Sequence, residues 1–124
     1  MKKSIEFSNE LYTYIKDLLK SLDNEKSYTR VKGFRLICLL SKYDKDNIIN
    51  KNIDYILSVL DNDKPTSIRQ YLAYLLVLID NKPELYEYII NKVNKIDLSK
   101  FKDSMSPLIE KDIEAINKYN HKSI

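Results

Sequence analysis

The chain has 124 residues, which is enough for one domain (residues 1–124) with a single hydrophobic core, and its 44% hydrophobic and 31% charged residues are ordinary for globular proteins. A net charge of +3 is too weak for a surface dedicated to neutralising phosphates, and one Cys excludes an internal disulfide. The longest apolar run, residues 71–79, is shorter than the ~20 residues needed to cross a bilayer, and no apolar signal core follows Met1. We therefore expect a cytoplasmic protein with no membrane partner.

The first two predicted helices form a pair. Residues 9–22 carry apolar side chains at three- and four-residue spacing, with Ser8 expected as the N-cap. Residues 28–42 are apolar around most of the helix circumference, so this helix is expected to lie between two neighbours. Gly33 inside it costs roughly 1 kcal/mol relative to Ala, which we expect a close approach of another helix to offset.

A polar connection over residues 43–52 leads to a third predicted helix over residues 53–60. Pro65, whose φ suits a first helical position, begins a fourth helix that continues to Ile79. A fully buried strand is the alternative for residues 71–79. The helix is favoured because the segment is continuous from Pro65, too long for a typical strand and rich in Leu and Ala.

Pro83 and Glu84 predict the start of a fifth helix that runs to about residue 94. In the loop over residues 96–103, Leu98 and Phe101 are expected to tuck under the hairpin. The sixth helix is predicted from residues 104–107 to about residue 119. Its inward-facing residues are expected to be Leu108, Ile109, Ile113 and Ile116.

An internal repeat relates the first two helix pairs. The apolar residues and acidic turn of residues 18–26 recur as residues 56–64, which is an offset of 38. In the following helices Arg30 matches Arg69 at an offset of 39, as though one residue had been added to the turn. A helix-pair period near 40 is typical of helical solenoids. It predicts three antiparallel hairpins over residues 8–42, 50–81 and 83–120, or about six helices.

The motif residues Asp61, Pro65, Ile68, Arg69, Ala73 and Leu76 resemble the HEAT consensus, and Thr29, Arg30 and Gly33 resemble it more weakly. The third pair departs from the pattern, with Lys111 as the nearest substitute for the arginine. The resemblance implies an all-α, right-handed superhelix of three stacked hairpins, as in HEAT and armadillo proteins. It also implies an Asp–Arg ladder in which Arg30 and Arg69 pair with Asp23 or Asp61.

Three further segments, residues 30–38, 60–70 and 102–113, are similar to a group of short helical-repeat proteins of low-GC Gram-positive bacteria, some of which are labelled "SufBD protein". That label would imply iron–sulfur assembly. One Cys and one His do not supply the ligands of a cluster, however, and helical hairpins differ from the β-helix of the assembly proteins. We expect no cofactor and no metal.

The second helix of each hairpin is expected to line the concave side of the stack. The residues of this predicted groove are Lys32, Arg35 and Lys42, followed by Gln70, Tyr71, Tyr74 and Leu78. On the last helix Glu110, Glu114, Asn117 and Lys118 would make the groove acidic and mixed. Such a polarised groove suits a protein or peptide segment. The alternative is that the charged side chains are solvated and the tyrosines pack with their hydroxyls in water.

Two other classes of function compete with protein binding. Basic side chains beside tyrosines can pair with phosphates and stack on bases, so nucleic-acid binding is the alternative function. Catalysis is not expected, because the chain has no glycine-rich phosphate loop, no calcium-loop pattern and a single His. An exposed end of the stack would also allow self-association.

Overall fold

The computed structural model describes the backbone of residues 2–122 and the side chains of residues 10–119. Residues 2–122 are all-α, as predicted, with no strand. They form the α-helices α1 (Lys2–Ser21), α2 (Ser27–Leu40), α3 (Ile48–Lys51), α4 (Ile53–Leu57), α5 (Pro65–Asn81), α6 (Tyr86–Val93) and α7 (Ser106–Lys122), and the 3₁₀ turns η1 (Ser41–Tyr43), η2 (Ser58–Asp61), η3 (Pro83–Leu85) and η4 (Leu98–Lys100).

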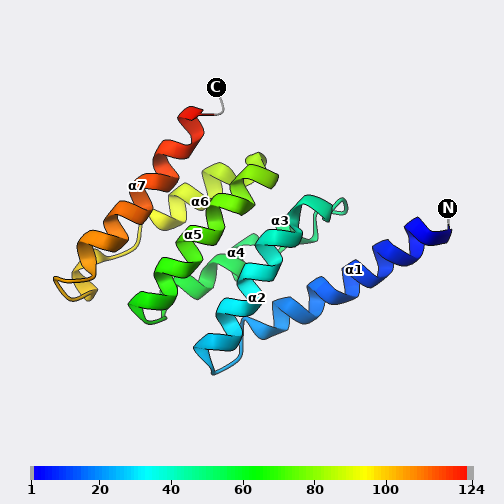
Figure 1. Ribbon diagram of the computed structural model, residues 1–124, viewed down its shortest axis with the longest axis horizontal. Coiled ribbons are helices and arrows are strands. Elements are labelled where there is room, and N and C mark those ends of the chain that lie inside the picture. The colour runs from blue at the N-terminus through cyan, green and yellow to red at the C-terminus, as the bar shows by residue number, and fades with distance from the viewer. Residues whose placement is uncertain (1, 123–124) are drawn as a thin grey trace.

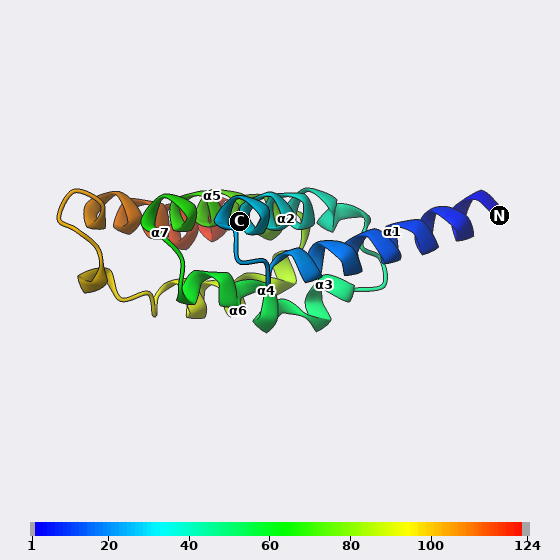
Figure 2. The same cartoon turned by 90° about the horizontal axis from the view of Figure 1, so that it is seen from below.

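The helices alternate between two layers. The longer helices α2, α5 and α7 lie side by side and run in the same direction (Figure 1). The shorter helices α3, α4 and α6 form the second layer beneath them (Figure 2). Helix α1 packs against α2 at one end of the molecule, and its first half extends beyond the rest of the chain (Figure 1).

Two predictions about the helices were wrong. Helix α1 begins at Lys2, so Ser8 lies inside the helix and does not cap it. The connection over residues 43–52 contains α3, which was not predicted. Asp44 accepts hydrogen bonds from the Ile48 and Ile49 amides at 3.0 and 2.8 Å, and these satisfy the first amides of α3.

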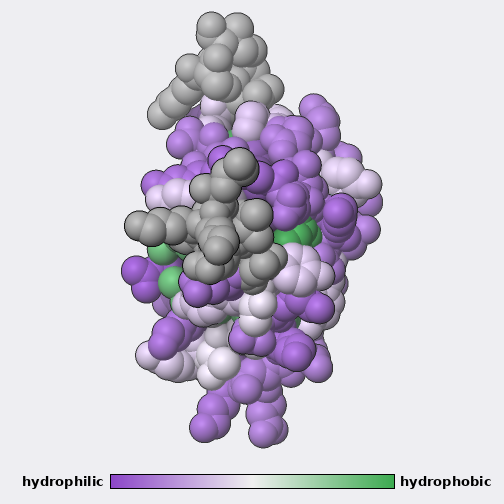
Figure 3. Space-filling view, turned by 90° about the vertical axis from the view of Figure 1, so that its right-hand side faces the viewer, coloured by the Kyte–Doolittle hydropathy of each residue, from purple (hydrophilic) through white to green (hydrophobic). Residues whose placement is uncertain are grey.

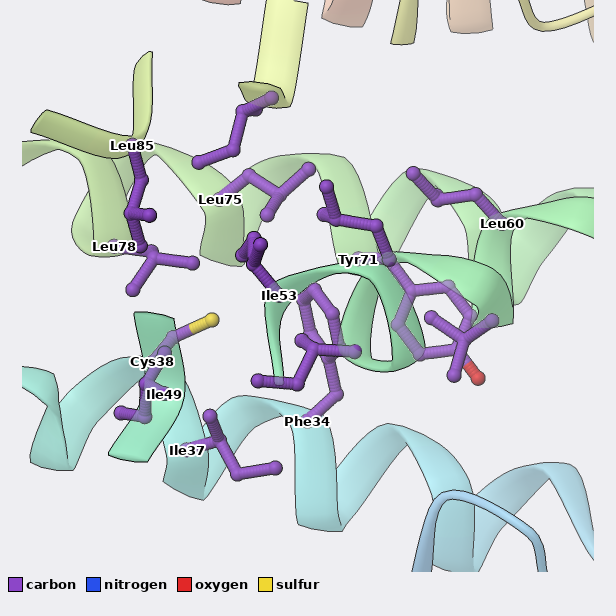
Figure 4. Close-up of a cluster of buried hydrophobic side chains, with 14 of the residues drawn as sticks. Phe34, Ile37, Cys38, Ile49, Ile53, Leu60, Tyr71, Leu75, Leu78 and Leu85 are labelled. Atoms are coloured by element: carbon purple, nitrogen blue, oxygen red, sulfur yellow. The ribbon is translucent and has the colours of Figure 1, made fainter. Parts of the chain in front are cut away.

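One continuous core joins the two layers. In this core the rings of Phe34 and Tyr71 meet edge to face with their centroids 4.9 Å apart, and Leu75 and Leu78 lie to one side of them (Figure 4). Both α2 and α5 pack between two neighbouring helices, and the buried side chains of each fall on one broad face. In the last hairpin Ile109 and Ile116 are fully buried, whereas Leu108, which was expected to face inward, is exposed.

Helix α1 approaches α2 closely at Gly33. A Cβ atom at this position would lie 1.8 Å from the Ser21 Oγ and 3.3 Å from the Leu18 carbonyl oxygen. The expectation of a close helix approach at this glycine is therefore confirmed.

A buried polar contact ties the residue after α5 to the connection that leads into α3. The Lys82 Nζ lies 3.4 Å from the Asp44 carboxylate and donates to the Asp44 carbonyl and the Asn47 side chain, and both side chains of the ion pair are buried. Because the charges are paired and also hydrogen-bonded, the buried ions are compensated. The same carboxylate that holds α3 therefore also fixes the start of the chain that leads into α6.

Candidate interaction groove

Arg30 bridges the first two hairpins through Asp63. The guanidinium Nε donates to one carboxylate oxygen at 3.1 Å and a terminal nitrogen lies 3.1 Å from the other, so the contact is two-pronged. Asp63 also accepts from the hydroxyls of Ser27, at 2.9 Å, and Tyr71, at 2.6 Å. Burial alone would raise the pKa of the Asp63 carboxyl, but these hydrogen bonds outweigh it and hold the pKa below its usual value.

Arg69 makes the corresponding bridge to the third hairpin. Its Nε and one terminal nitrogen donate to the Asp112 carboxylate at 2.8 and 3.3 Å. Both arginines thus join neighbouring hairpins, but neither pairs with Asp23 or Asp61 as predicted. Asp61 pairs instead with Lys92 on α6. The acid that meets Arg30 lies two residues beyond Asp61, because Asp63 is the turn residue that faces α2.

A groove of about 450 Å³ lies between the first halves of α2 and α5. Four of the residues predicted for the interaction groove line it. The wall on α2 carries Lys32 and Arg35, and the wall on α5 carries Gln70 and Tyr74. The remaining lining residues, which the sequence did not single out, are Ser27, Tyr28, Val31, Lys64, Thr66 and Ser67.

The groove carries positive charge. Lys32, Arg35 and Lys64 contribute three cations, and none of the described residues that line the groove is acidic. Asp63, the nearest acidic residue in the sequence, is turned toward Arg30 and Tyr71 and is almost completely buried. Tyr28, which is 77% exposed, and Tyr74 add aromatic surface. The arrangement suits an anionic segment that also has an apolar or aromatic side chain.

Three predicted groove residues lie elsewhere. Tyr71 and Leu78 are 0% exposed and belong to the core, so neither is available to a partner. The Tyr71 hydroxyl is bonded to Asp63 and is not in water, and burial together with that carboxylate raises its pKa. Lys42 is exposed in η1, near the far end of α2, where its Nζ lies 5.0 Å from the ring centre of Tyr43.

The misplacement of Tyr71 and Leu78 has a single physical origin. The offset of 39, taken from the two arginines, equates Lys32 with Tyr71. Burial instead follows an offset of 38, which equates exposed Lys32 with exposed Gln70 and buried Gly33 with buried Tyr71. The same one-residue shift equates exposed Leu39 with half-buried Val77 in place of buried Leu78. The turn therefore has no inserted residue, and one position of a helix, about 100°, separates core from groove.

A second depression of about 580 Å³ lies between α5 and α7. Its walls carry Lys111, Glu114 and Lys118 together with Leu76, Ala115 and Tyr119. The mixed charge expected at this end is present through Glu114 and Lys118. Asn117 points elsewhere, because its side-chain amide exchanges hydrogen bonds with that of Asn94 at the end of α6.

The described part of the chain offers no constellation for metal binding, since no three His, Cys, Asp or Glu side chains gather there. None of its helices has the length and apolar character of a membrane span. No protein-family model, curated protein or solved structure matches the chain. The HEAT resemblance therefore stays a prediction, and function has to be inferred from the groove.

Proposed function

We propose that this protein is a non-catalytic interaction module, a HEAT-like stack that binds an acidic protein or peptide segment in the groove between α2 and α5. The observation that carries the proposal is that three cationic side chains line the groove and that none of the described residues lining it is acidic. A segment rich in Asp and Glu would be attracted over several ångströms and oriented before contact.

The walls of the groove also favour a polypeptide. Val31 and Tyr74 give it an apolar strip, and Ser27, Thr66 and Gln70 give it hydroxyl and amide groups that can meet a peptide backbone. The first turns of α2 and α5 lie side by side here, since the Ser27 and Ser67 hydroxyls are 2.6 Å apart. The parallel helices thus present two amino-terminal ends to the same region, which adds partial positive charge.

The proposal is tested with a fluorescently labelled peptide of alternating Glu and Tyr residues, whose binding is followed by fluorescence anisotropy. The double variant Lys32→Glu, Arg35→Glu should bind it at least tenfold more weakly, because both changes place repulsive charge in the groove. The matched control is Lys45→Glu, Lys51→Glu, which makes the same change in net charge on exposed lysines near the opposite layer. The control should bind like the native chain.

Equal loss of affinity in both double variants would show that only net charge matters and would contradict the groove assignment. A helical far-UV spectrum for all three proteins ensures that binding is compared between folded chains. Absence of binding to the native chain at low ionic strength would contradict the proposal as well.

Nucleic-acid binding is the second candidate, and it is favoured by the two tyrosines beside the cations. Tyr28 projects from the start of α2 with 77% of its surface exposed, and Tyr74 lies on the opposite wall. Bases stack on such rings while lysine and arginine contact phosphates, with about 1–3 kcal/mol per stacked base.

Titration of labelled single-stranded DNA at two salt concentrations separates the two candidates. A nucleic-acid protein would lose affinity steeply with salt and would also lose it on Tyr28→Ala, Tyr74→Ala. Weak binding to DNA alongside retained binding to the acidic peptide would eliminate this second function.

A further inference from the structure

Helix α1 has an exposed edge with the charge opposite to that of the groove. Ile15, Leu18 and Leu22 are buried on one side of the helix. Glu10, Tyr14 and Asp17 fall at three- and four-residue spacing on another side, are all exposed, and line one shallow depression. Tyr14 is 45% exposed and stands between the two carboxylates. We call these three residues the acidic edge of α1.

The acidic edge matches the groove in length as well as in charge. Glu10 and Asp17 are seven residues apart, or about 10 Å along a helix. In the groove, Arg35 lies eight residues beyond Ser27, or about 12 Å along α2, and Lys64 precedes the first turn of α5. A carboxylate near each end of the groove would leave the Tyr14 ring over its apolar strip, beside Val31 and Tyr74.

The acidic edge cannot reach the groove of its own molecule while α1 stays packed. Helix α1 contacts α2 on the side of Gly33, where Ser21 and Leu18 approach it. The groove opens on the opposite side of α2, toward α5, through Val31 and Arg35. A second copy of the chain is therefore the source of an acidic edge for this groove.

The acidic edge is also accessible to such a copy, because Glu10, Tyr14 and Asp17 are all exposed. The backbone of α1 before this edge extends beyond the rest of the molecule in both ribbon views (Figures 1 and 2). Figure 3 views the molecule from this side, and the coloured part of the surface is mainly hydrophilic, with a few hydrophobic residues among hydrophilic ones. A contact here would be electrostatic in character and would weaken as salt is added.

We propose that the acidic edge of α1 in one copy docks in the α2–α5 groove of another, so that the chain associates with itself. This inference rests on the proposed function, because it names the acidic segment that the groove takes. Two copies that insert α1 reciprocally would close into a dimer, whereas one-way insertion would build an open chain.

The test is sedimentation velocity on the full-length chain over a wide range of concentration, with two charge-reversed variants. One variant is Glu10→Lys, Asp17→Lys, and the other is Lys32→Glu, Arg35→Glu. The native chain should associate as concentration rises, and each variant alone should stay monomeric, because like charges then face each other. An equimolar mixture of the two variants should associate again, since each groove then meets an α1 of opposite charge.

A native chain that stays monomeric throughout would overturn the inference, and so would a variant that associates alone or a mixture that remains monomeric. Far-UV spectra check that the variants are folded. If the lysine variant unfolds, the neutral variant Glu10→Gln, Asp17→Asn replaces it. This neutral variant should weaken association at least tenfold. The labelled Glu–Tyr peptide distinguishes the two proposals. If the native chain is monomeric and binds the peptide, the self-association proposal is wrong and the proposed groove function stands. If the native chain is monomeric and does not bind the peptide, the proposed groove function is wrong as well.

Discussion

At the scale of single residues, Gly33 sets how closely α1 can approach α2. We expect Gly33→Leu to lower the free energy of unfolding by about 2–3 kcal/mol, because the larger side chain would collide with Ser21 and with the Leu18 carbonyl. Urea unfolding followed by circular dichroism measures the change. An unaltered midpoint would mean that the two helices separate at no cost.

Gly33→Ala measures the energy of the same contact with a smaller change in side-chain volume. Alanine favours the helix by about 1 kcal/mol, but its Cβ would overlap the Ser21 Oγ. Ser21→Ala removes that oxygen. We therefore expect Gly33→Ala to be less destabilising in the Ser21→Ala background than in the native chain, and a double-mutant cycle on urea midpoints measures the coupling.

Asp63 links stability to pH. Its pKa is lower in the folded chain than in the unfolded chain, so its contribution to stability is fully present above the unfolded value of about 3.9 and disappears as pH falls through the folded value. We expect the native chain and Asp63→Asn to differ most in unfolding free energy near neutral pH, and this difference to shrink as pH falls below about 4. Urea titrations at several pH values measure this; a constant difference would contradict it.

The positions of individual residues were predicted well where they depend on the local helix alone. Gly33 was interpretable because a glycine inside a helix needs a compensating contact, and Lys32, Arg35, Gln70 and Tyr74 fell on the exposed side of their helices. Tyr71 and Leu78 were misplaced because the register was taken from two arginines. The partners of those arginines depend on three-dimensional packing that a repeat offset does not report.

At the scale of elements, the arginine bridges hold neighbouring hairpins together with unequal strength. Removing Arg30 leaves the buried Asp63 without its counter-ion, which costs about 3 kcal/mol. Arg69 is 40% exposed, and its pair with Asp112 is screened by water, so Arg69→Ala should cost clearly less than Arg30→Ala. Arg35→Ala, on the groove wall, should change stability by less than about 0.5 kcal/mol.

Thermal and urea unfolding of the three alanine variants check this order. The largest loss is expected for Arg30 and the smallest for Arg35. A larger effect of Arg35 than of Arg69 would mean that the groove wall, and not the bridge, supports the stack.

Helix α3 depends on Asp44. A helix of four residues cannot stand alone in water, and this one is held by the two amide bonds to Asp44 and by the burial of Ile48 and Ile49. We expect Asp44→Ala to cost about 3 kcal/mol, since it also strands the Lys82 ammonium. Hydrogen exchange should show early loss of protection at the Ile48 and Ile49 amides. Unchanged protection there would show that apolar burial alone maintains the helix.

The absence of α3 from the sequence prediction has the same explanation. Its segment is rich in Asp, Lys and Asn, and its helical turn comes from a carboxylate four residues upstream and from contacts with Lys82. Helices α2, α5 and α7 were found readily because their apolar periodicity extends over several turns. Short elements are decided by tertiary contacts, which local patterns do not contain.

At the scale of the whole molecule, Cys38 reports on global opening. Its side chain is 0% exposed in the core, and burial raises the pKa of the thiol. We expect a disulfide exchange reagent to modify the native chain only as fast as the core opens, and to modify the chain at once in denaturant. Rapid modification under native conditions would show that the core opens without global unfolding.

The repeat period predicted the all-α class and the alternation of helices, and both are present in residues 2–122. The groove was less accessible to prediction. Its lining includes residues at the starts of α2 and α5, such as Tyr28 and Lys64, where helical periodicity has barely begun. A surface built at the ends of elements depends on how those ends are juxtaposed.

The two layers differ in how their helices are divided. One consists of the unbroken rods α2, α5 and α7, and the other of the short pieces α3, α4 and α6, with the 3₁₀ turn η2 directly after α4 and η3 directly before α6. Rods resist bending, whereas a row of one- and two-turn segments can pivot at each joint. Under mechanical load, the layer of short helices should therefore bend between its segments, while the layer of α2, α5 and α7 keeps its shape.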